Sequence, residues 1–247
     1  MTSIPRLDSE IPYLTTAQMR AVDQLMIEEY DIEILQMMEN AGRNLAHLAR
    51  ERFFDGDPVG KRVAVLAGTG GNGGDALVAA RRLHSYGAHV EVHVIDDDAE
   101  FAPVSAHLLA ALRRIGARIN VGIPGEHPEN IDLVIDGVIG YSLSGAPRGI
   151  AAELIRWAND IDADVLAVDV PSGVDASNGE VFDPAVSATA TMALALPKEG
   201  LRTEEARAHV GELYLADIGV PPELYRRQVV GLEVGHIFSR SDIVRVW

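Results

Sequence analysis

Cysteine is absent from the 247-residue sequence, which excludes disulfides and thiolate chemistry. Lysine is scarce as well, since Lys61 and Lys198 are the two lysines and arginine supplies the other basic side chains. The formal net charge of −16 argues against a nucleic-acid backbone as a partner. No apolar run approaches the ~20 residues of a membrane-spanning helix, so we expect no membrane association. An export signal is also missing from the first twenty residues, so we expect a cytoplasmic protein.

Hydrophobic residues make up 47% of the chain, enough to bury a full core. Apolar residues at three- and four-residue spacing predict two N-terminal helices within 15–52, with Thr15 or Thr16 capping the first and Asp31 the second. Short apolar runs then alternate with amphipathic stretches, which indicates βαβ units and a parallel sheet covered on both faces. The expected strands are 62–66, 89–95, 133–135, 165–170, 190–196 and 210–215, and the expected helices are 76–83, 104–115 and 151–157.

We expect a single domain over residues 1–247. In this interpretation the N-terminal helices, 15–52, pack on an α/β core, 61–220, because no Gly/Ser/Pro linker separates the two. A C-terminal tail, 221–247, begins with two prolines that start a helix or a turn.

A glycine loop, residues 67–75 with the sequence AGTGGNGGD, follows the first expected strand and opens a helix. Gly68, Gly70 and Gly73 fit the G-x-G-x-x-G pattern, and Asp96 follows about twenty residues on, as in NAD-dependent dehydrogenases. Glycines let a phosphate approach the backbone, and the free N–H groups of a helix N-terminus favour an anion. A tight strand–helix turn without a ligand is the alternative reading of this loop.

Two polar residues inside the glycine loop fit the dehydrogenase interpretation poorly. The oxygens of Asn72 and Asp75 would crowd a pyrophosphate unless a cation or hydroxyl groups intervene. Asp75 is interpreted either as a site residue or as a cap of the following helix.

Further polar residues follow other expected strands. Asp136 ends one apolar strand, and Asp169 sits inside another apolar run, where a carboxylate is costly unless it is paired or used. A structural Asp that caps a turn is the alternative for Asp169. Lys198 is the weaker candidate, because a lone lysine in a turn is usually solvated. The carboxyl ends of parallel strands meet at the edge where α/β sheets bind ligands, so we expect Asp136 and Asp169 to converge there.

Taken together, motifs along nearly the whole chain resemble the YjeF N-terminal domain family, the NAD(P)H-hydrate epimerases. The motifs are MRAVD at 19–23, MENAG at 38–42, the glycine loop, the Asp136 loop, DVPSGVD at 169–175, PK at 197–198 and DIGVP at 217–221. The resemblance implies a Rossmann-like three-layer α/β/α sandwich with a mostly parallel central sheet.

The resemblance implies an enzyme, an isomerase that interconverts the R and S epimers of hydrated NADH and NADPH (NADHX and NADPHX). Such an enzyme serves metabolite repair, because a partner dehydratase acts on the S form. The dehydratase domain that is fused in many members is not found here, so we expect a separate NAD(P)HX dehydratase as pathway partner. A homodimer is one expected assembly.

The resemblance also assigns site residues. Thirteen residues are expected to contact the substrate: Gly71, Asn72, Gly73, Gly74, Asp75, Gly140, Tyr141, Ser142, Leu143, Ser144, Gly145, Ala146 and Asp169. Three residues with hard oxygen ligands match the family's potassium ligands, so K⁺ is the expected cofactor: Asn72, Asp136 and Ser172.

Asp169 is the expected catalytic residue. Moving a hydroxyl from one face of C6 to the other needs a group that gives and takes a proton, and partial burial raises the pKa of a carboxyl toward the working pH. Two departures from the family pattern are Gly71, where an asparagine is usual, and Ala76, where a glycine is usual.

Two other functions stay open. One is a non-catalytic scaffold or RNA-associated module of the same fold, and the other is an NAD-dependent dehydrogenase that uses the glycine fingerprint with Asp96.

Overall fold

The protein is described by a computed structural model that covers residues 4–96, 101–124 and 130–247. The strands are β1 (Arg62–Ala67), β2 (His89–Val94), β3 (Arg118–Val121), β4 (Leu133–Gly137), β5 (Asp164–Val168), β6 (Ala190–Leu194), β7 (Glu212–Ala216) and β8 (Ile243–Arg245). They form one eight-stranded sheet in the order β3-β2-β1-β4-β5-β6-β7-β8. All neighbouring pairs are parallel except β7 and β8, so the expected mostly parallel sheet is confirmed.

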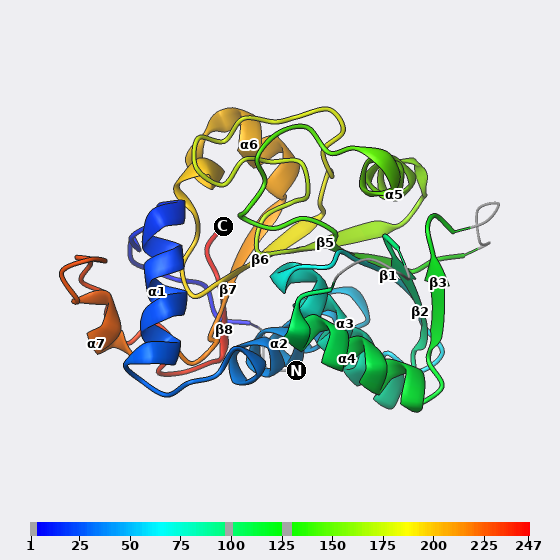
Figure 1. Cartoon of the computed structure of the whole chain (residues 1–247), viewed down its shortest axis with the longest axis horizontal. Helices are drawn as coiled ribbons and strands as arrows, with labels where there is room; N and C mark the ends of the chain where they lie inside the picture. The colour runs from blue at the N-terminus through cyan, green and yellow to red at the C-terminus, as the bar shows by residue number, and fades with distance from the viewer. Residues whose placement is uncertain (1–3, 97–100, 125–129) are drawn as a thin grey trace.

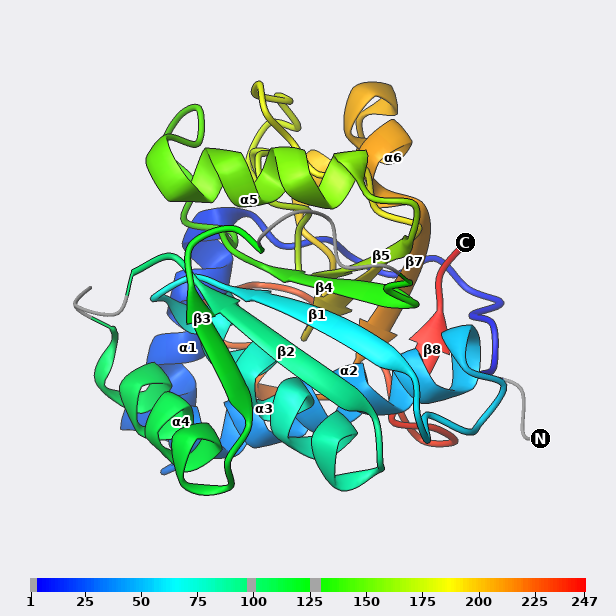
Figure 2. The same cartoon turned by 90° about the vertical axis from the view of Figure 1, so that its right-hand side faces the viewer.

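Helices cover both faces of the sheet. They are α1 (Thr16–Glu28), α2 (Ile34–Phe53), α3 (Gly71–Ser85), α4 (Pro103–Arg114), α5 (Gly149–Asp160), α6 (Glu204–Val210) and α7 (Pro222–Tyr225), with a 3₁₀ turn at Glu199–Arg202. Figures 1 and 2 show α2, α3 and α4 on one face and α5 on the other. The expected three-layer α/β/α sandwich is thus confirmed. No helix in the described part of the chain is long and apolar enough to cross a membrane.

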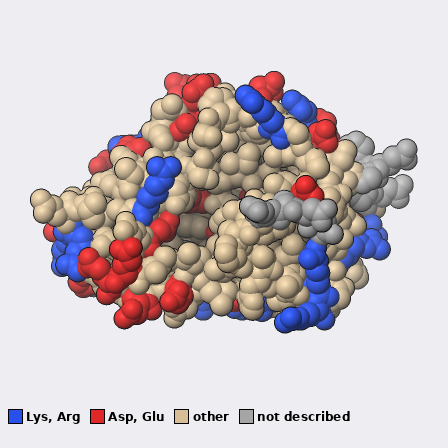
Figure 3. Space-filling view, viewed as in Figure 1, with Lys and Arg blue, Asp and Glu red and all other residues tan. Residues whose placement is uncertain are grey.

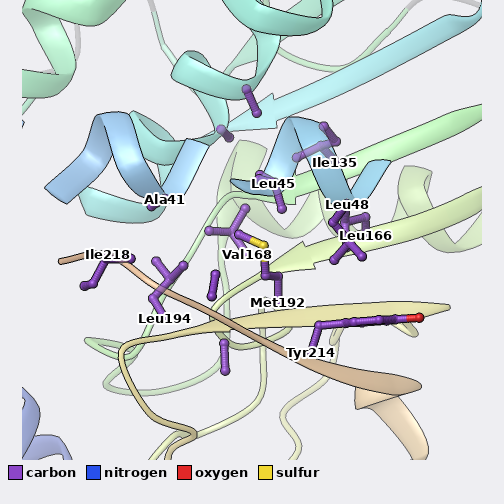
Figure 4. Packing of buried hydrophobic residues seen from close by; sticks show 14 of the residues in the cluster. Ala41, Leu45, Leu48, Ile135, Leu166, Val168, Met192, Leu194, Tyr214 and Ile218 are labelled. Atoms are coloured by element: carbon purple, nitrogen blue, oxygen red, sulfur yellow. The ribbon is translucent and has the colours of Figure 1, made fainter. Parts of the chain in front are cut away.

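Alternating side chains along the strands build two hydrophobic clusters, one on each face of the sheet. On β5, Leu166 and Val168 belong to the cluster under α2, whereas Val165 and Ala167 belong to the cluster under α5. Figure 4 shows the first cluster, in which Leu45 and Leu48 of α2 lie over side chains of β4, β5 and β6. The first cluster runs from Leu14 to Val244, so the N-terminal helices, the sheet and the C-terminal tail share one core.

Local chemistry explains where the elements begin. Thr15 caps α1 as predicted, with its hydroxyl accepting from the Gln18 N–H at 3.1 Å. The predicted cap at Asp31 is wrong: the N-cap of α2 is Glu33, and Asp31 lies in a left-handed turn with φ of 52°. Helix α3 starts at Gly71 rather than near Ala76, so the glycine loop itself forms the first turn of the helix.

The limits of several strands differ from the predictions, and two strands were not predicted; the expected strand 190–196, for example, ends at Leu194. Strand β5 stops at Val168 instead of reaching 170, because Asp169 adopts a positive φ of 64° that ends the extended chain. The expected strand 210–215 begins at Glu212, since Val210 still belongs to α6. Strands β3 and β8 were not predicted, and β8 pairs the C-terminal tail with β7.

The order of the strands creates a crevice at one edge of the sheet. From β1 the chain moves outward to β2 and β3, then returns to β4 on the other side of β1. Ligands of open α/β sheets bind at such a switch point, beyond the carboxyl ends of the strands. The glycine loop follows β1, Asp136 lies near the end of β4, and Asp169 follows β5, so the topology brings these three features to this edge.

Candidate functional site

A pocket of about 640 Å³ opens at the switch point. Its lining comes from α1, α2, the glycine loop, the start of α4, residues 138–142 and Asp169. Figure 3 shows a hollow near the centre of this face with acidic side chains beside it. The volume lies within the range of cofactor and small-molecule sites, about 300–1,000 Å³.

Two positions of the glycine loop have no room for a side chain, because another part of the backbone packs directly against them. A Cβ on Gly73 would lie 1.9 Å from the Gly68 carbonyl oxygen, and one on Gly68 would lie 2.0 Å from the Val138 carbonyl oxygen. At Gly70 and Gly71, by contrast, an added Cβ would meet nothing within 4 Å. No side chain among the described residues caps α3, so the N–H groups of its first turn are available to an anion.

Asn72 and Asp136 lie against the same loop, near Ser172. The Asn72 side-chain amide donates to the Val168 carbonyl at 2.6 Å, and a Cβ on Gly140 would lie 2.2 Å from Asn72 Oδ1. Asp136 accepts from the Ser172 hydroxyl at 2.6 Å and from the Ser172 N–H at 2.8 Å. Asp136 is 1% exposed, and no cationic side chain among the described residues forms an ion pair with its carboxylate. Burial raises the pKa of the Asp136 carboxyl, while the Ser172 hydrogen bonds oppose that shift.

Asp169 forms a buried ion pair with Lys198. The side chain of Lys198 is fully buried, and its ammonium donates to Asp169 Oδ1, to the Leu194 carbonyl at 2.9 Å and to the Leu196 carbonyl at 3.2 Å. Asp169 Oδ1 also accepts the Leu194 N–H at 3.0 Å. The interpretation of Lys198 as a solvated turn residue is therefore wrong. The left-handed backbone of Asp169 redirects its carboxylate from the strand to this pair.

The N-terminal segment holds the turn that carries Lys198. Leu14 donates its N–H to the Pro197 carbonyl at 2.8 Å and accepts the Glu199 N–H at 2.9 Å. These two hydrogen bonds flank Lys198 on both sides, so the position of the ammonium depends on a segment from the other end of the chain.

Two more carboxyl groups line the pocket. The Asp23 carboxylate on α1 accepts the Tyr141 hydroxyl at 2.7 Å, which ties α1 to the loop that follows β4. Burial raises the pKa of Asp23, and the Tyr141 hydrogen bond opposes this shift. Asp75 lies in the second turn of α3 and does not cap that helix, so the capping interpretation is wrong. It is 5% exposed, and burial raises its pKa well above the usual range.

Comparison with known proteins decides the family. Residues 34–200 match the family described as YjeF-related protein N-terminus. This chain belongs to the YjeF N-terminal family.

Relatives in the YjeF N-terminal family align over most of the chain. A protein of Dehalogenimonas lykanthroporepellens named NAD(P)H-hydrate epimerase is 43% identical over 87% of this chain and 84% of its own length. A protein of Moorella thermoacetica named bifunctional NAD(P)H-hydrate repair enzyme Nnr is 34% identical over 87% of this chain but 42% of its own length. The crystal structure of the yeast protein YNL200c has the same fold, with a TM-score of 0.78 at 23% identity over 96% of this chain and all of that one.

Eight of the substrate contacts expected from the YjeF N-terminal resemblance line the pocket: Gly71, Asn72, Gly73, Asp75, Gly140, Tyr141, Ser142 and Asp169. Five others do not line it: Gly74, Leu143, Ser144, Gly145 and Ala146. Gly74 instead packs against α2 and α4, since a Cβ there would lie 2.8 Å from Met38 Sδ and 2.8 Å from Ser105 Oγ. The roles of all thirteen as substrate contacts stay predictions.

Sequence reasoning missed Asp23 as a site residue and ranked Lys198 low because it expected that side chain to be solvated. Asp23 lies one helical turn after Met19, on the same face of α1, and this spacing is the signal that could have placed it toward the core. Lys198 follows a buried strand in a chain with two lysines, but no pattern in the sequence distinguishes a buried lysine in a turn from a solvated one. Met37, Met38 and Ala41 of α2 form an apolar wall of the pocket.

Proposed function

We propose that this chain is an NAD(P)H-hydrate epimerase, an isomerase that interconverts the R and S epimers of hydrated NADH and NADPH. The family and the names of several relatives support this function. The observation that carries it is the carboxyl group of Asp169, 2% exposed beside the pocket and held by Lys198 and the Leu194 N–H. Epimerisation at C6 needs such a group to move a proton at the hydroxyl.

The uncapped N-terminus of α3 is the proposed site of the substrate pyrophosphate. Its N–H groups and helix dipole favour an anion, and an added Cβ at Gly70 or Gly71 would meet no described residue within 4 Å, which leaves room for a ligand beside the backbone. The hydrated nicotinamide ring would then lie toward the carboxyl groups of the pocket. The dehydratase that removes water from the S epimer would be a separate protein.

The deciding experiment mixes the purified protein with R-NADHX and an S-specific dehydratase, and follows the reappearance of NADH by absorbance. An epimerase feeds the dehydratase, so all of the R form is consumed. If NADH reappears no faster than in the dehydratase alone, the proposed function is wrong.

Two alternative functions fit the site less well. An RNA-associated module would need a basic surface, whereas three carboxyl groups line this pocket and the net charge is −16. In a dehydrogenase the Asp96 carboxylate would accept a hydrogen bond from a ribose hydroxyl of the cofactor. Here Asp96 is exposed and does not line the pocket, whereas the neighbouring Ile95 does. The two acidic residues that follow Asp96, at 97 and 98, lie outside the described residues.

The substitution Asp96→Ala distinguishes the two functions, because only a dehydrogenase would bind the cofactor ribose through Asp96. We expect hydrated-cofactor binding to stay within about twofold of wild type, well under 1 kcal/mol, because the side chain is outside the pocket. A dehydrogenase-type hydrogen bond to the ribose would instead cost ~1.5–3 kcal/mol. Isothermal titration with NADPHX measures the difference, and a tenfold loss of affinity would support the dehydrogenase pose.

We further propose that K⁺ binds at Asn72, Asp136 and Ser172. All three offer hard oxygen ligands, and the buried charge of Asp136 has no cationic side chain beside it among the described residues. Bound there, K⁺ would balance this carboxylate and orient substrate oxygens.

Potassium is therefore expected to raise the melting temperature of the protein at constant ionic strength. Choline at the same concentration should not, because the methyl groups on its nitrogen keep oxygen ligands from coordinating the charge. Asp136→Ala should abolish the difference between the two salts, which differential scanning fluorimetry measures. Equal melting curves of the wild-type protein in potassium and choline salts would exclude the site.

A further inference from the structure

Three carboxyl groups line the pocket and interact with the ammonium of Lys198, and the formal charges of these four groups do not balance. Asp23 comes from α1, Asp75 from α3, Asp169 from the end of β5 and Lys198 from the turn after β6. The Asp75 carboxyl interacts electrostatically with each of the other three groups. Three ionised carboxylates beside one ammonium would leave two uncompensated negative charges in a largely buried site, which is costly. Tyr141 adds no cation, since its hydroxyl donates to Asp23 and burial raises its pKa.

The contacts of Lys198 show which of the three carboxyl groups is paired with its ammonium. An ammonium has three donors, and those of Lys198 are taken by two backbone carbonyls and Asp169 Oδ1. Asp169 Oδ1 thus accepts from an ammonium and from a backbone N–H, the contacts of a carboxylate in an ion pair. Asp169 Oδ2 accepts no hydrogen bond from the described residues, so it is available to take a proton.

Asp75 is in the opposite situation. Its side chain is 5% exposed and lines the same pocket. Among the described residues, none donates a hydrogen bond to either of its carboxyl oxygens and none forms an ion pair with it. Burial is the main cause of its raised pKa, the charges of Asp169 and Asp23 add to the shift, and Lys198 opposes it. A buried carboxyl without a donor beside it is better neutral than ionised, and the neutral form carries a proton that it can donate.

We infer that Asp75 is a second catalytic residue, a neutral acid that gives its proton to the departing C6 hydroxyl while ionised Asp169 takes a proton from the incoming water. The inference rests on the proposed epimerase function. Acid–base pairs arise where the surroundings of two carboxyl groups hold them in different protonation states, and here the two groups come from separate elements of the same pocket.

The bond changes balance without any oxidant or reductant. The proton of Asp75 passes to the hydroxyl oxygen, the C6–O bond breaks with its electron pair on the departing water, and the lone pair of the ring nitrogen forms a double bond to C6. Water then adds to the other face of C6, its proton passes to Asp169, and the nitrogen regains its lone pair. Solvent returns the proton from Asp169 to Asp75, so the net change is inversion at C6.

Asp75→Asn tests this role because the amide keeps the shape of the side chain but has no proton to give. We expect kcat to fall at least about 100-fold, with the Kd for NADPHX changed by less than about threefold. Chromatographic separation of the R and S epimers measures the rate without a coupling enzyme. Asp132→Asn is the matched control, since Asp132 is a surface carboxyl at the other end of the sheet, paired with Lys61 at 3.6 Å.

A second readout does not depend on activity. A carboxyl whose pKa is raised in the folded protein destabilises it as pH rises above the unfolded pKa of about 3.9, because the unfolded chain ionises first. Removing that carboxyl removes the effect. The melting temperature of Asp75→Asn should therefore exceed that of wild type at neutral pH, and the difference should shrink as the pH falls toward 4.

Infrared difference spectra locate the proton. At neutral pH we expect a protonated-carboxyl band that Asp75→Asn removes and Asp23→Asn retains. A band that survives Asp75→Asn and disappears in Asp23→Asn would overturn the inference, as would a near-wild-type kcat of folded Asp75→Asn. Failure of the wild-type protein to epimerise would overturn the proposed function itself, so the two failures are distinguishable.

Discussion

Asp169→Asn is expected to lower the epimerisation rate by about 10²–10⁴-fold, the usual effect of removing a general acid–base group. The amide keeps the size of the carboxylate but cannot take a proton from water. Because Lys198 is fully buried, the same change also leaves an ammonium without its counter-charge. We therefore expect a loss of unfolding free energy of ~3–5 kcal/mol in addition to the loss of rate.

The rate has to be measured on the folded fraction, which circular dichroism determines. Asp160→Asn, at the end of α5 and outside the pocket, provides the control for an Asp-to-Asn change in a helix-rich protein. A folded Asp169→Asn protein with the wild-type rate would falsify the assignment of Asp169.

Lys198→Met is expected to destabilise the protein by ~3–5 kcal/mol, because it leaves the Asp169 carboxylate buried beside two other carboxyl groups without a cation. The Met side chain fills most of the space of the lysine stem, so packing contributes little to the loss. Chemical denaturation measures the free energy of unfolding. The double variant Asp169→Asn/Lys198→Met removes both charges and should recover much of the stability of either single variant.

The double variant should nevertheless stay inactive, and this outcome separates the chemical role of the pair from its structural role. Lys61→Met is the matched control, since Lys61 is the other lysine of the chain and its ion pair with Asp132 is exposed. We expect that change to cost no more than about 1 kcal/mol. Recovery of both stability and activity in the double variant would show that the ion pair is structural alone.

The fold was largely predictable because its signals are periodic. Strands buried on both faces appear as short apolar runs, and helices between them appear at three- and four-residue spacing, so β1, β2, β4, β5 and β6 were located from the sequence. Strands β3 and β8 were missed because edge strands need fewer apolar residues. β3 is partly exposed along its whole length, and β8 spans three residues. The limits of β5 depended on the left-handed turn at Asp169, which its residue type did not indicate.

The site was predictable only where loops follow strands. The glycine loop and Asp169 could be placed at one edge of the sheet, because parallel strands end there together. The partners of these residues could not be placed, since Asp23 and Lys198 reach the site through tertiary packing of segments that are remote in sequence. The protonation of each carboxyl depends on these partners, and so does the difference between Asp75 and Asp169.

The hydrogen bonds of Leu14 on either side of Lys198 have a consequence for the order of folding. On the ribosome, Leu14 emerges long before Pro197 and Glu199, so these hydrogen bonds are non-local contacts that form late. The family match begins at residue 34, downstream of both Leu14 and Asp23. A nascent chain can therefore assemble much of the sheet before the candidate site is complete, because the turn that carries Lys198 still has to pair with the segment around Leu14.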